Sequence, residues 1–163
     1  LNLTRMGEPR AFPLDLKEFA GRVIGESGLP AGITVVQEFT TEAATVKGDH
    51  EQMRIVFHNL ITNAVQAMNG QGTLRVAISR DNGMARLSVA DTGPGIPPEN
   101  LGKIFQPLFS TKTIGIGLGL PITRKIIEKH HGTITLEPEP GWGAVFVVRL
   151  PLGGGPGRTE PTP

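Results

Sequence analysis

The sequence contains no cysteine, and that absence excludes several classes of site. Without thiols, its 163 residues can form no disulfide framework, no thiolate zinc site and no catalytic cysteine. An excess of charge of either sign is also missing, because 16 Lys and Arg residues nearly balance 15 Asp and Glu residues without a run of like charges. We therefore expect neither a nucleic-acid partner nor an acidic tail.

Long hydrophobic runs are absent as well. No apolar segment approaches the length of a membrane-spanning helix, and no signal-peptide pattern is present. Together with the lack of cysteine, this predicts a soluble, cytoplasmic domain that makes no direct membrane contact. The length of 163 residues matches one ordinary domain with a sizeable core.

The two ends of the chain differ from its centre. Residues 1–5 have the character of the last turn of a helix, which Gly-Glu-Pro at residues 7–9 would break. Because the first residue is not Met, we expect residues 1–11 to be a linker in a piece of a longer protein. Residues 153–163 are rich in Gly and Pro, which predicts a disordered tail. The folded domain should span residues 12–152.

The hydrophobic periodicity of this domain alternates between helix and strand. Apolar residues at three- and four-residue steps predict helices over residues 15–27, 49–68 and 118–131. β-branched or alternating segments predict strands over residues 34–39, 73–79, 86–90, 132–136 and 144–150. This order predicts an α+β fold, a two-layer α/β sandwich in which three helices cover one face of a mixed, mostly antiparallel sheet.

Three polar residues follow one edge of the predicted central helix. Asn59, Asn63 and Gln66 are four and three residues apart, so they project from nearly the same side, beside the apolar stripe. A carboxamide oxygen is a hard, neutral ligand that suits Mg²⁺ when substrate phosphates supply the negative charge. In isolation, such residues favour an ordinary solvated helix face. The glycine-rich segments that follow reverse this preference.

Asp91 ends a predicted strand just before a turn at Gly93 and Gly95. Its carboxylate is placed to accept a hydrogen bond from the exocyclic amine of adenine, whereas the carbonyl oxygen of guanine would be repelled. Two other interpretations compete, because Asp-Thr-Gly is a common turn and also the short signature of aspartic proteases. The protease needs a second catalytic Asp of the same kind, and the Pro-Gly-Ile-Pro run at residues 94–97 disfavours it.

A second glycine cluster, at Gly115, Gly117 and Gly119, precedes the last predicted helix. Glycines let backbone N–H groups approach phosphate oxygens, and a helix N-terminus favours an anion. A dinucleotide-binding fingerprint would need its third glycine where Leu120 stands, and no Gly-Lys-Ser or Gly-Lys-Thr phosphate loop occurs. The cluster therefore indicates a nucleotide pocket of another kind.

Four segments in fixed order resemble the N, G1, F and G2 boxes of the catalytic ATP-binding domain of sensor histidine kinases. They occupy residues 59–64, 91–96, 105–112 and 115–120. The resemblance covers roughly residues 12–150 and implies a Bergerat-type ATP-binding fold, shared with gyrase, heat-shock chaperones and mismatch-repair ATPases. The short third segment looks most like the nitrogen-regulation branch.

The resemblance implies a role toward ATP and Mg²⁺ for each matching residue. Asn63 would hold Mg²⁺ with help from Asn59, Gln66 would contact phosphate, and Asp91 would bind adenine. The residues implied to wall the base are Gly93, Gly95 and Ile96. Those implied to face the phosphates, partly within a mobile lid over residues 97–117, are Thr111, Lys112, Gly115, Ile116, Gly117, Leu118 and Gly119.

The resemblance also implies a reaction and partners. The γ-phosphoryl group of ATP would pass to a histidine on a dimerisation domain, of which residues 1–11 would be the remnant. It also implies that the full-length protein forms a homodimer and works with a response regulator. A membrane tether elsewhere in the full-length protein would be compatible with it. Gyrase-type ATPases carry a water-activating Glu at the position of Asn59, and Asn cannot serve as that base. Transfer is therefore favoured over hydrolysis.

Two positions depart from the family pattern. Ala144 stands where a Thr commonly follows Gly-x-Gly, so a hydroxyl near the adenine is missing and lower affinity is expected. Leu108 stands where an aromatic residue is frequent, which should change the packing of the lid.

No histidine of this chain is expected to accept the phosphoryl group. His50-Glu51 imitates the start of a phosphoacceptor box without its downstream Pro, and His58, His130 and His131 suit structural roles on helices. Two alternatives stand beside the kinase: an autonomous ATPase of the same superfamily, and a non-catalytic nucleotide-binding scaffold module.

Overall fold

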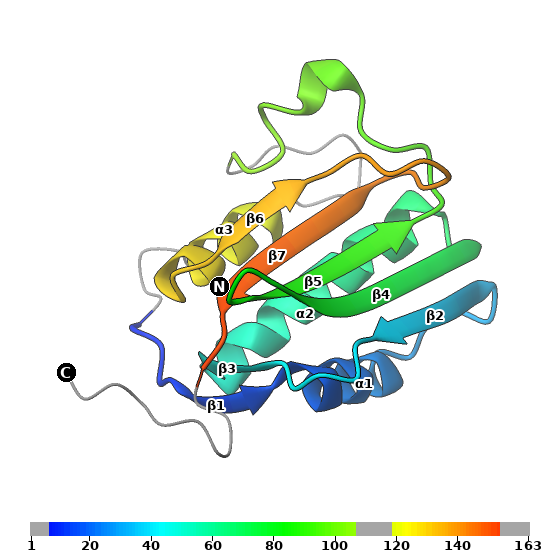
Figure 1. Cartoon of the computed structure of the whole chain (residues 1–163). Coiled ribbons are helices and arrows are strands. Elements are labelled where there is room, and N and C mark those ends of the chain that lie inside the picture. The colour runs from blue at the N-terminus through cyan, green and yellow to red at the C-terminus, as the bar shows by residue number, and fades with distance from the viewer. Residues whose placement is uncertain (1–6, 107–118, 154–163) are drawn as a thin grey trace.

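A five-stranded sheet forms the centre of the protein, and the computed structural model describes residues 7–106 and 119–153 (Figure 1). The strands lie in the order β2-β4-β5-β7-β6; β2 and β4 run parallel, and the other neighbouring pairs are antiparallel. Their bounds are Ile33–Phe39 for β2, Gly72–Asp81 for β4, Met84–Asp91 for β5, Thr133–Leu136 for β6 and Val145–Pro151 for β7. The predicted mixed, mostly antiparallel sheet is confirmed.

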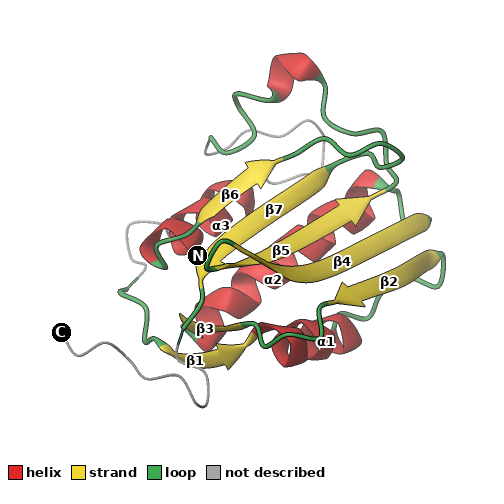
Figure 2. Ribbon diagram, viewed as in Figure 1, coloured by secondary structure: helices red, strands yellow, loops and turns green. Residues whose placement is uncertain are grey.

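Three helices pack on one face of this sheet, also as predicted (Figure 2). They are α1 (Leu16–Glu26), α2 (His50–Ala67) and α3 (Gly119–Lys129). The carboxylate of Asp49 caps α2 by accepting from the backbone N–H of Gln52. The helix ends where Asn69 and Gly70 take φ angles of 54° and 80°, which an α-helix cannot continue. No helix in the described ranges is long and apolar enough to cross a membrane.

Two short strands and one helical turn are absent from the sequence prediction. β1 (Phe12–Asp15) and β3 (Thr45–Gly48) pair antiparallel as a separate small sheet, and η2 (Pro98–Asn100) is a 3-10 helix. Pro13 and Asp15 in β1 and Gly48 in β3 are residue types that are depleted in strands, which is why the pattern along the sequence did not indicate these two strands. Leu14 and Val46, each 1% exposed, join the small sheet to the main core.

The hydrophobic core lies between the helices and the inner face of the sheet. Leu74, Val76 and Ile78 of β4 are buried there, while Arg75 lies on the outer face, in the alternation expected of a strand covered on one side. The helix α2 lies across the middle of the sheet (Figure 1). Its core residues are Met53, Val56, Phe57, Leu60, Ile61 and Ala64. The polar edge of α2 therefore runs beside the core, toward the end of β5.

Candidate functional site

Asp91, the last residue of β5, is held in place by backbone groups. The residue is 3% exposed, and its side chain alternates with Ala90 on the outer face, so it is directed to the helix side. Its Oδ1 accepts hydrogen bonds from the backbone N–H groups of Gly93 (2.8 Å) and Ala144 (3.4 Å). The backbone carbonyl of Asp91 accepts from the N–H of Gly143 (2.7 Å). These contacts fix the direction of the carboxylate before any ligand binds.

Close backbone packing around Asp91 explains three glycines. A Cβ on Gly93 would lie 2.7 Å from the carbonyl oxygen of Ala67, and a Cβ on Gly143 would overlap the carbonyl oxygen of Gly93. Gly95 has a φ of +81°, and an added Cβ there would lie 3.1 Å from the carbonyl oxygen of Gly143. The loop after β5 therefore packs directly on the end of α2 and on the residues that precede β7.

Ile96 and the first part of the predicted lid, which begins at residue 97, are anchored by apolar contacts. Ile96, predicted to wall a base, is half-buried and packs on the main core, and Ile104 is 5% exposed. Phe105 packs edge-to-face on Phe146 of β7, with ring centroids 6.4 Å apart. The guanidinium of Arg124 lies 5.5 Å from the centre of the Phe105 ring. Residues 96–105 are thereby fastened to β7 and α3.

Asn59 connects α2 to the first turn of α3. Its Nδ2 donates to the carbonyl oxygen of Gly119 (3.2 Å) and to Oγ1 of the fully buried Thr123 (3.4 Å). Both bonds use the amide nitrogen, so Oδ1 is the atom of Asn59 suited to a cation. Asn63 and Gln66 are half-buried and lie further along α2, toward the helix end that meets the loop after β5. The helix α2 thus lies beside both the residues predicted to bind the base and those predicted to bind Mg²⁺ and phosphate.

Several predicted positions fall outside the described residues. They are Leu108 and the site residues Thr111, Lys112, Gly115, Ile116, Gly117 and Leu118. Residues 1–6 and 154–163 also lie outside. The roles of these site residues and the predicted domain bounds stay predictions.

The donor set along α2 fits a magnesium ion that also binds a substrate. Within residues 7–106 and 119–153, no group of three or more His, Cys, Asp or Glu side chains is arranged to hold a metal. Mg²⁺ keeps several waters and commonly takes its other ligands from one or two side chains and from substrate phosphates. The carboxamide oxygens of Asn59 and Asn63 suit that arrangement when a phosphate supplies the negative charge.

Sequence reasoning missed the backbone just before β7 that holds Asp91. Gly143 and Ala144 attracted notice only because a Thr is lacking at position 144, yet both contact Asp91 through their N–H groups. Ala144 is 5% exposed, and its bond to Asp91 needs no side chain. The carboxylate therefore remains held without the missing hydroxyl. Thr123, the buried partner of Asn59, carried no motif that could have indicated it.

His130 has a structural role, as expected. It is 6% exposed, its Nε2 accepts from the backbone N–H of Asp49 (3.0 Å), and its Nδ1 donates to the carbonyl oxygen of Ile126 (2.8 Å). The Nε2 bond joins the end of α3 to the start of α2, and the Nδ1 bond fixes the ring on the last turn of α3.

Comparison with protein families decides the class of this site. A model described as the histidine kinase-, DNA gyrase B-, and HSP90-like ATPase family matches residues 48–154. The chain belongs to this family. The matched range contains α2, β4 to β7 and every predicted site residue, and the resemblance found through the four boxes is confirmed.

Individual relatives are sensor kinases. Sporulation kinase C of Bacillus subtilis is 37% identical over 131 residues, which cover 80% of this chain and 31% of the relative. The sensory histidine kinase/phosphatase NtrB of Rhodobacter capsulatus is 33% identical over 159 residues, covering 88% of this chain and 44% of NtrB. The chain spans less than half the length of these two curated relatives.

A solved structure matches over nearly its whole length. The catalytic domain of histidine kinase ThkA, in a nucleotide-free form, has a TM-score of 0.76 and 32% identity. The match covers 88% of this chain and 96% of the ThkA domain. The two-layer α+β fold is therefore that of a histidine kinase catalytic domain.

Proposed function

We propose that the chain is the catalytic ATP-binding domain of a two-component sensor histidine kinase. It binds Mg²⁺·ATP and presents the γ-phosphoryl group to a histidine on a dimerisation domain outside this sequence. The arrangement along α2 carries the proposal: the fixed carboxylate of Asp91 lies by the C-terminal end of the helix, and Asn59, in contact with the start of α3, lies at its middle. This separation suits a ligand with a base at one end and phosphates at the other.

The base binds at the Asp91 end of the site. The exocyclic amine of adenine donates to the carboxylate, whereas guanine would direct a carbonyl oxygen at it. The backbone bonds from Gly93 and Ala144 support this assignment, because they hold the carboxylate in one direction. Gly93, Gly95 and Ile96 flank the base.

The phosphates bind at the Asn59 end. Asn63 and Asn59 hold Mg²⁺, Gln66 contacts a phosphate oxygen, and Gly119 opens α3, whose N-terminal N–H groups favour an anion. When bound, Mg²⁺ supplies charge neutralisation for the transfer of the phosphoryl group. The remaining phosphate contacts come from the lid: Thr111, Lys112, Gly115, Ile116, Gly117 and Leu118.

Phosphoryl transfer is favoured over hydrolysis by the chemistry of Asn59. An amide cannot take a proton from water, and the Nδ2 of Asn59 is already bonded to Gly119 and Thr123. An autonomous ATPase would need a general base at this position. Sustained phosphate release by the isolated chain would support the ATPase against the kinase.

The partners follow from the kinase assignment. The full-length protein works as a homodimer through its own dimerisation domain, and a response regulator receives the phosphoryl group. The names of the relatives, a sporulation kinase and a sensory histidine kinase/phosphatase, support this class of partner. The domain works in the cytoplasm, without direct membrane contact of its own.

Calorimetric titration of the chain with ATP and with GTP, each with and without Mg²⁺, tests the base and the metal together. ATP should bind more tightly than GTP, and Mg²⁺ should strengthen binding. The variant Asn63→Ala should lose the Mg²⁺-dependent part of the affinity, because the metal loses a ligand. Unchanged affinity in that variant would refute the metal assignment.

Adding the matching histidine hairpin and labelled ATP separates the kinase from a scaffold module. A kinase labels the hairpin histidine, whereas a scaffold leaves it unlabelled. The variant Asp81→Asn, a carboxylate at the far end of β4, is the control and should label at the wild-type rate.

A further inference from the structure

A tight turn joins β6 to β7 on the face of the sheet opposite the helices. At residues 139–142 the backbone N–H of Trp142 donates to the carbonyl oxygen of Glu139 (3.2 Å). Pro140 and Gly141 occupy the two central positions, and Gly141 has a φ of +90°. Pro followed by a positive-φ Gly is the signature of a type II β-turn. The sequence therefore sets the shape of this turn locally.

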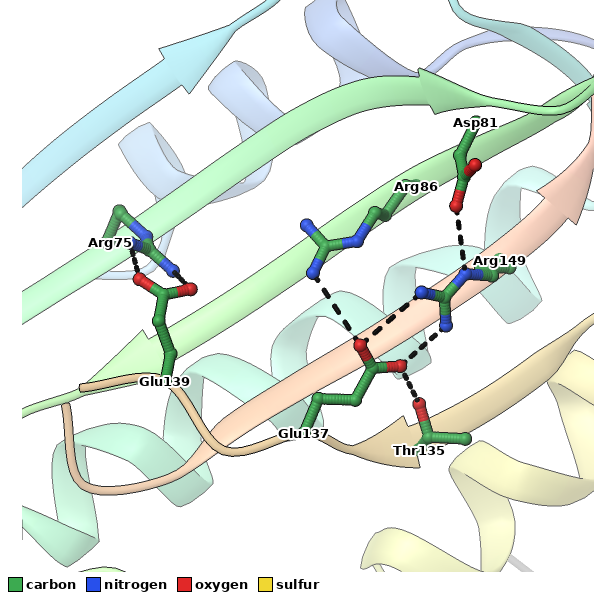
Figure 3. Close-up of polar contacts among 7 residues, drawn as sticks. All are labelled: Arg75, Asp81, Arg86, Thr135, Glu137, Glu139 and Arg149. Atoms are coloured by element: carbon green, nitrogen blue, oxygen red, sulfur yellow. Dashed lines mark hydrogen bonds and ion pairs between the residues drawn. The ribbon is translucent and has the colours of Figure 1, made fainter.

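The turn is fastened to β4 by Arg75 (Figure 3). The guanidinium of Arg75 makes two bonds to the carboxylate of Glu139, Nη1 to Oε2 at 2.5 Å and Nη2 to Oε1 at 2.9 Å. The same guanidinium lies 4.6 Å from the centre of the Trp142 ring. The Arg75 side chain is 12% exposed and the Glu139 side chain 37%, so the guanidinium half of this two-pronged pair is shielded from water.

Apolar contacts hold the turn from beneath. Trp142 packs on Ala90, Val145 and Val147, three residues that are 0% to 2% exposed and form a second, smaller hydrophobic cluster on the outer face. Arg75, Ala90 and Val145 are cross-strand partners on β4, β5 and β7. The ring of Trp142 and the guanidinium of Arg75 therefore cover one row of the sheet.

That row is adjacent to Asp91. The next cross-strand pair along β4 and β5 is Leu74 with Asp91, and the residue after Trp142 is Gly143. Gly143 donates to the Asp91 carbonyl at 2.7 Å and packs against Gly93 without room for a Cβ. A displacement of the turn therefore moves Gly143 against the backbone that holds the Asp91 carboxylate.

We propose that Arg75, Glu139 and Trp142 are positioning residues that fix the adenine end of the nucleotide site through Gly143. This inference rests on the proposed function, since it names what orients the base-binding carboxylate from the far side of the sheet. Loss of the Arg75–Glu139 pair should weaken ATP binding although neither side chain reaches the nucleotide.

A second ion pair on the same face provides a matched control (Figure 3). Glu137 accepts from Nη1 of Arg149 (2.6 Å) and from Oγ1 of Thr135 (2.7 Å), which links β6 to β7. Arg149 lies five residues along β7 from Ala144 and has no hydrogen bond in the described structure to Gly143 or Asp91. The two glutamates thus differ in their link to the site and resemble each other in chemistry.

The experiment measures ATP affinity by calorimetry and thermal unfolding in the wild type, Glu139→Gln, Trp142→Ala and Glu137→Gln. We expect about tenfold weaker ATP binding in Glu139→Gln and Trp142→Ala, and wild-type affinity in Glu137→Gln, with comparable Tm for the two glutamine variants. Trp142→Phe, which keeps a ring beneath Arg75, should restore most of the affinity. With the single variant Arg75→Lys measured alongside, the double variant Arg75→Lys Glu139→Gln should lose less affinity than the sum of the two single losses, because the two residues act as one unit.

The outcomes separate the two proposals. If the wild type binds ATP and Glu139→Gln and Trp142→Ala bind equally well, the positioning role is wrong and the proposed function stands. Equal losses in Glu137→Gln and Glu139→Gln would also overturn the positioning role, because they would reflect general loosening of the sheet. If the wild type binds no adenine nucleotide, the proposed function itself fails.

Discussion

At the scale of single residues, Asp91 shows how the environment of a side chain determines its chemistry. Its Oδ1 is taken by two backbone N–H groups, from Gly93 and Ala144. In Asp91→Asn, the same two donors would retain the amide oxygen, and the –NH₂ group would then replace the other carboxylate oxygen. A donor would face the amine of adenine, whereas the carbonyl of guanine would meet a donor.

The variant Asp91→Asn should therefore bind ATP about 10- to 100-fold more weakly, while its affinity for GTP falls less or rises. Competition between the two nucleotides in a single calorimetric series measures the change in preference. An unchanged ratio of ATP to GTP affinity in this variant would show that Asp91 does not read the base.

Gly143 is a second residue whose replacement should have a large effect. An added Cβ would overlap the carbonyl oxygen of Gly93, so Gly143→Ala should destabilise the fold by about 1–3 kcal/mol and weaken ATP binding. Gly102→Ala is the control, because a Cβ at Gly102 meets no atom within 4 Å. Urea unfolding of both variants tests the difference; equal stability of the two would contradict the close approach.

At the scale of elements, α1 contains two glycines that packing does not require. A Cβ at Gly21 or at Gly25 would meet no atom within 4 Å, and neither has a positive φ. Each Gly→Ala change should therefore stabilise the protein by about 0.5–1 kcal/mol through helix propensity. Gly32→Ala should destabilise instead, since its Cβ would lie 2.6 Å from the carbonyl oxygen of Gly70. Thermal unfolding of the three variants gives the order.

Elements with a clear hydrophobic pattern could be predicted from the sequence, whereas β1 and β3 could not. The helix predicted over residues 49–68 is observed as α2 (His50–Ala67), because its apolar stripe, its Asp49 cap and its Asn-Gly end all agree. β1 and β3 have four residues each and gain their stability from pairing with one another, which no local pattern records. Tertiary contacts, and not hydrophobic periodicity, therefore determine that these two segments are strands.

The residues of the candidate site likewise divide into those that the sequence indicated and those that it did not. Asn59 and Asp91 were found because glycine-rich segments follow them at fixed spacing. Thr123 and the turn at residues 139–142 were missed, since one acts through a buried hydroxyl and the other from the opposite face of the sheet. Such partners depend on which strands are neighbours, and the sequence order of β5 and β7 does not state that they pair.

At the scale of the whole molecule, acid should weaken the fold through the outer face. Hydrogen bonds from Arg149 and then Thr135 lower the pKa of Glu137 from 4.5 to about 2, and the Arg75 pair lowers the pKa of Glu139. A pKa that is lower in the folded state adds stability above the unfolded value, and that stability is lost as the pH falls from about 4.5 toward 2.

Unfolding free energy measured by urea titration should therefore decline over this pH range, and less steeply in Glu137→Gln than in the wild type. The substitution removes the titrating carboxyl while leaving Glu139 in place. An identical slope in the two proteins would show that the Arg149 pair does not couple to folding.

The central place of β5 also bears on how the protein fluctuates. β5 is flanked by β4 and β7, so its amide groups are hydrogen-bonded on both edges and open only in large, rare excursions of the sheet. The group that would meet the base is carried by this strand, whereas Asn59 reaches the first turn of a helix that begins beside the lid. If the proposed function holds, the adenine end would keep its shape during nucleotide exchange and serve as the point of first attachment.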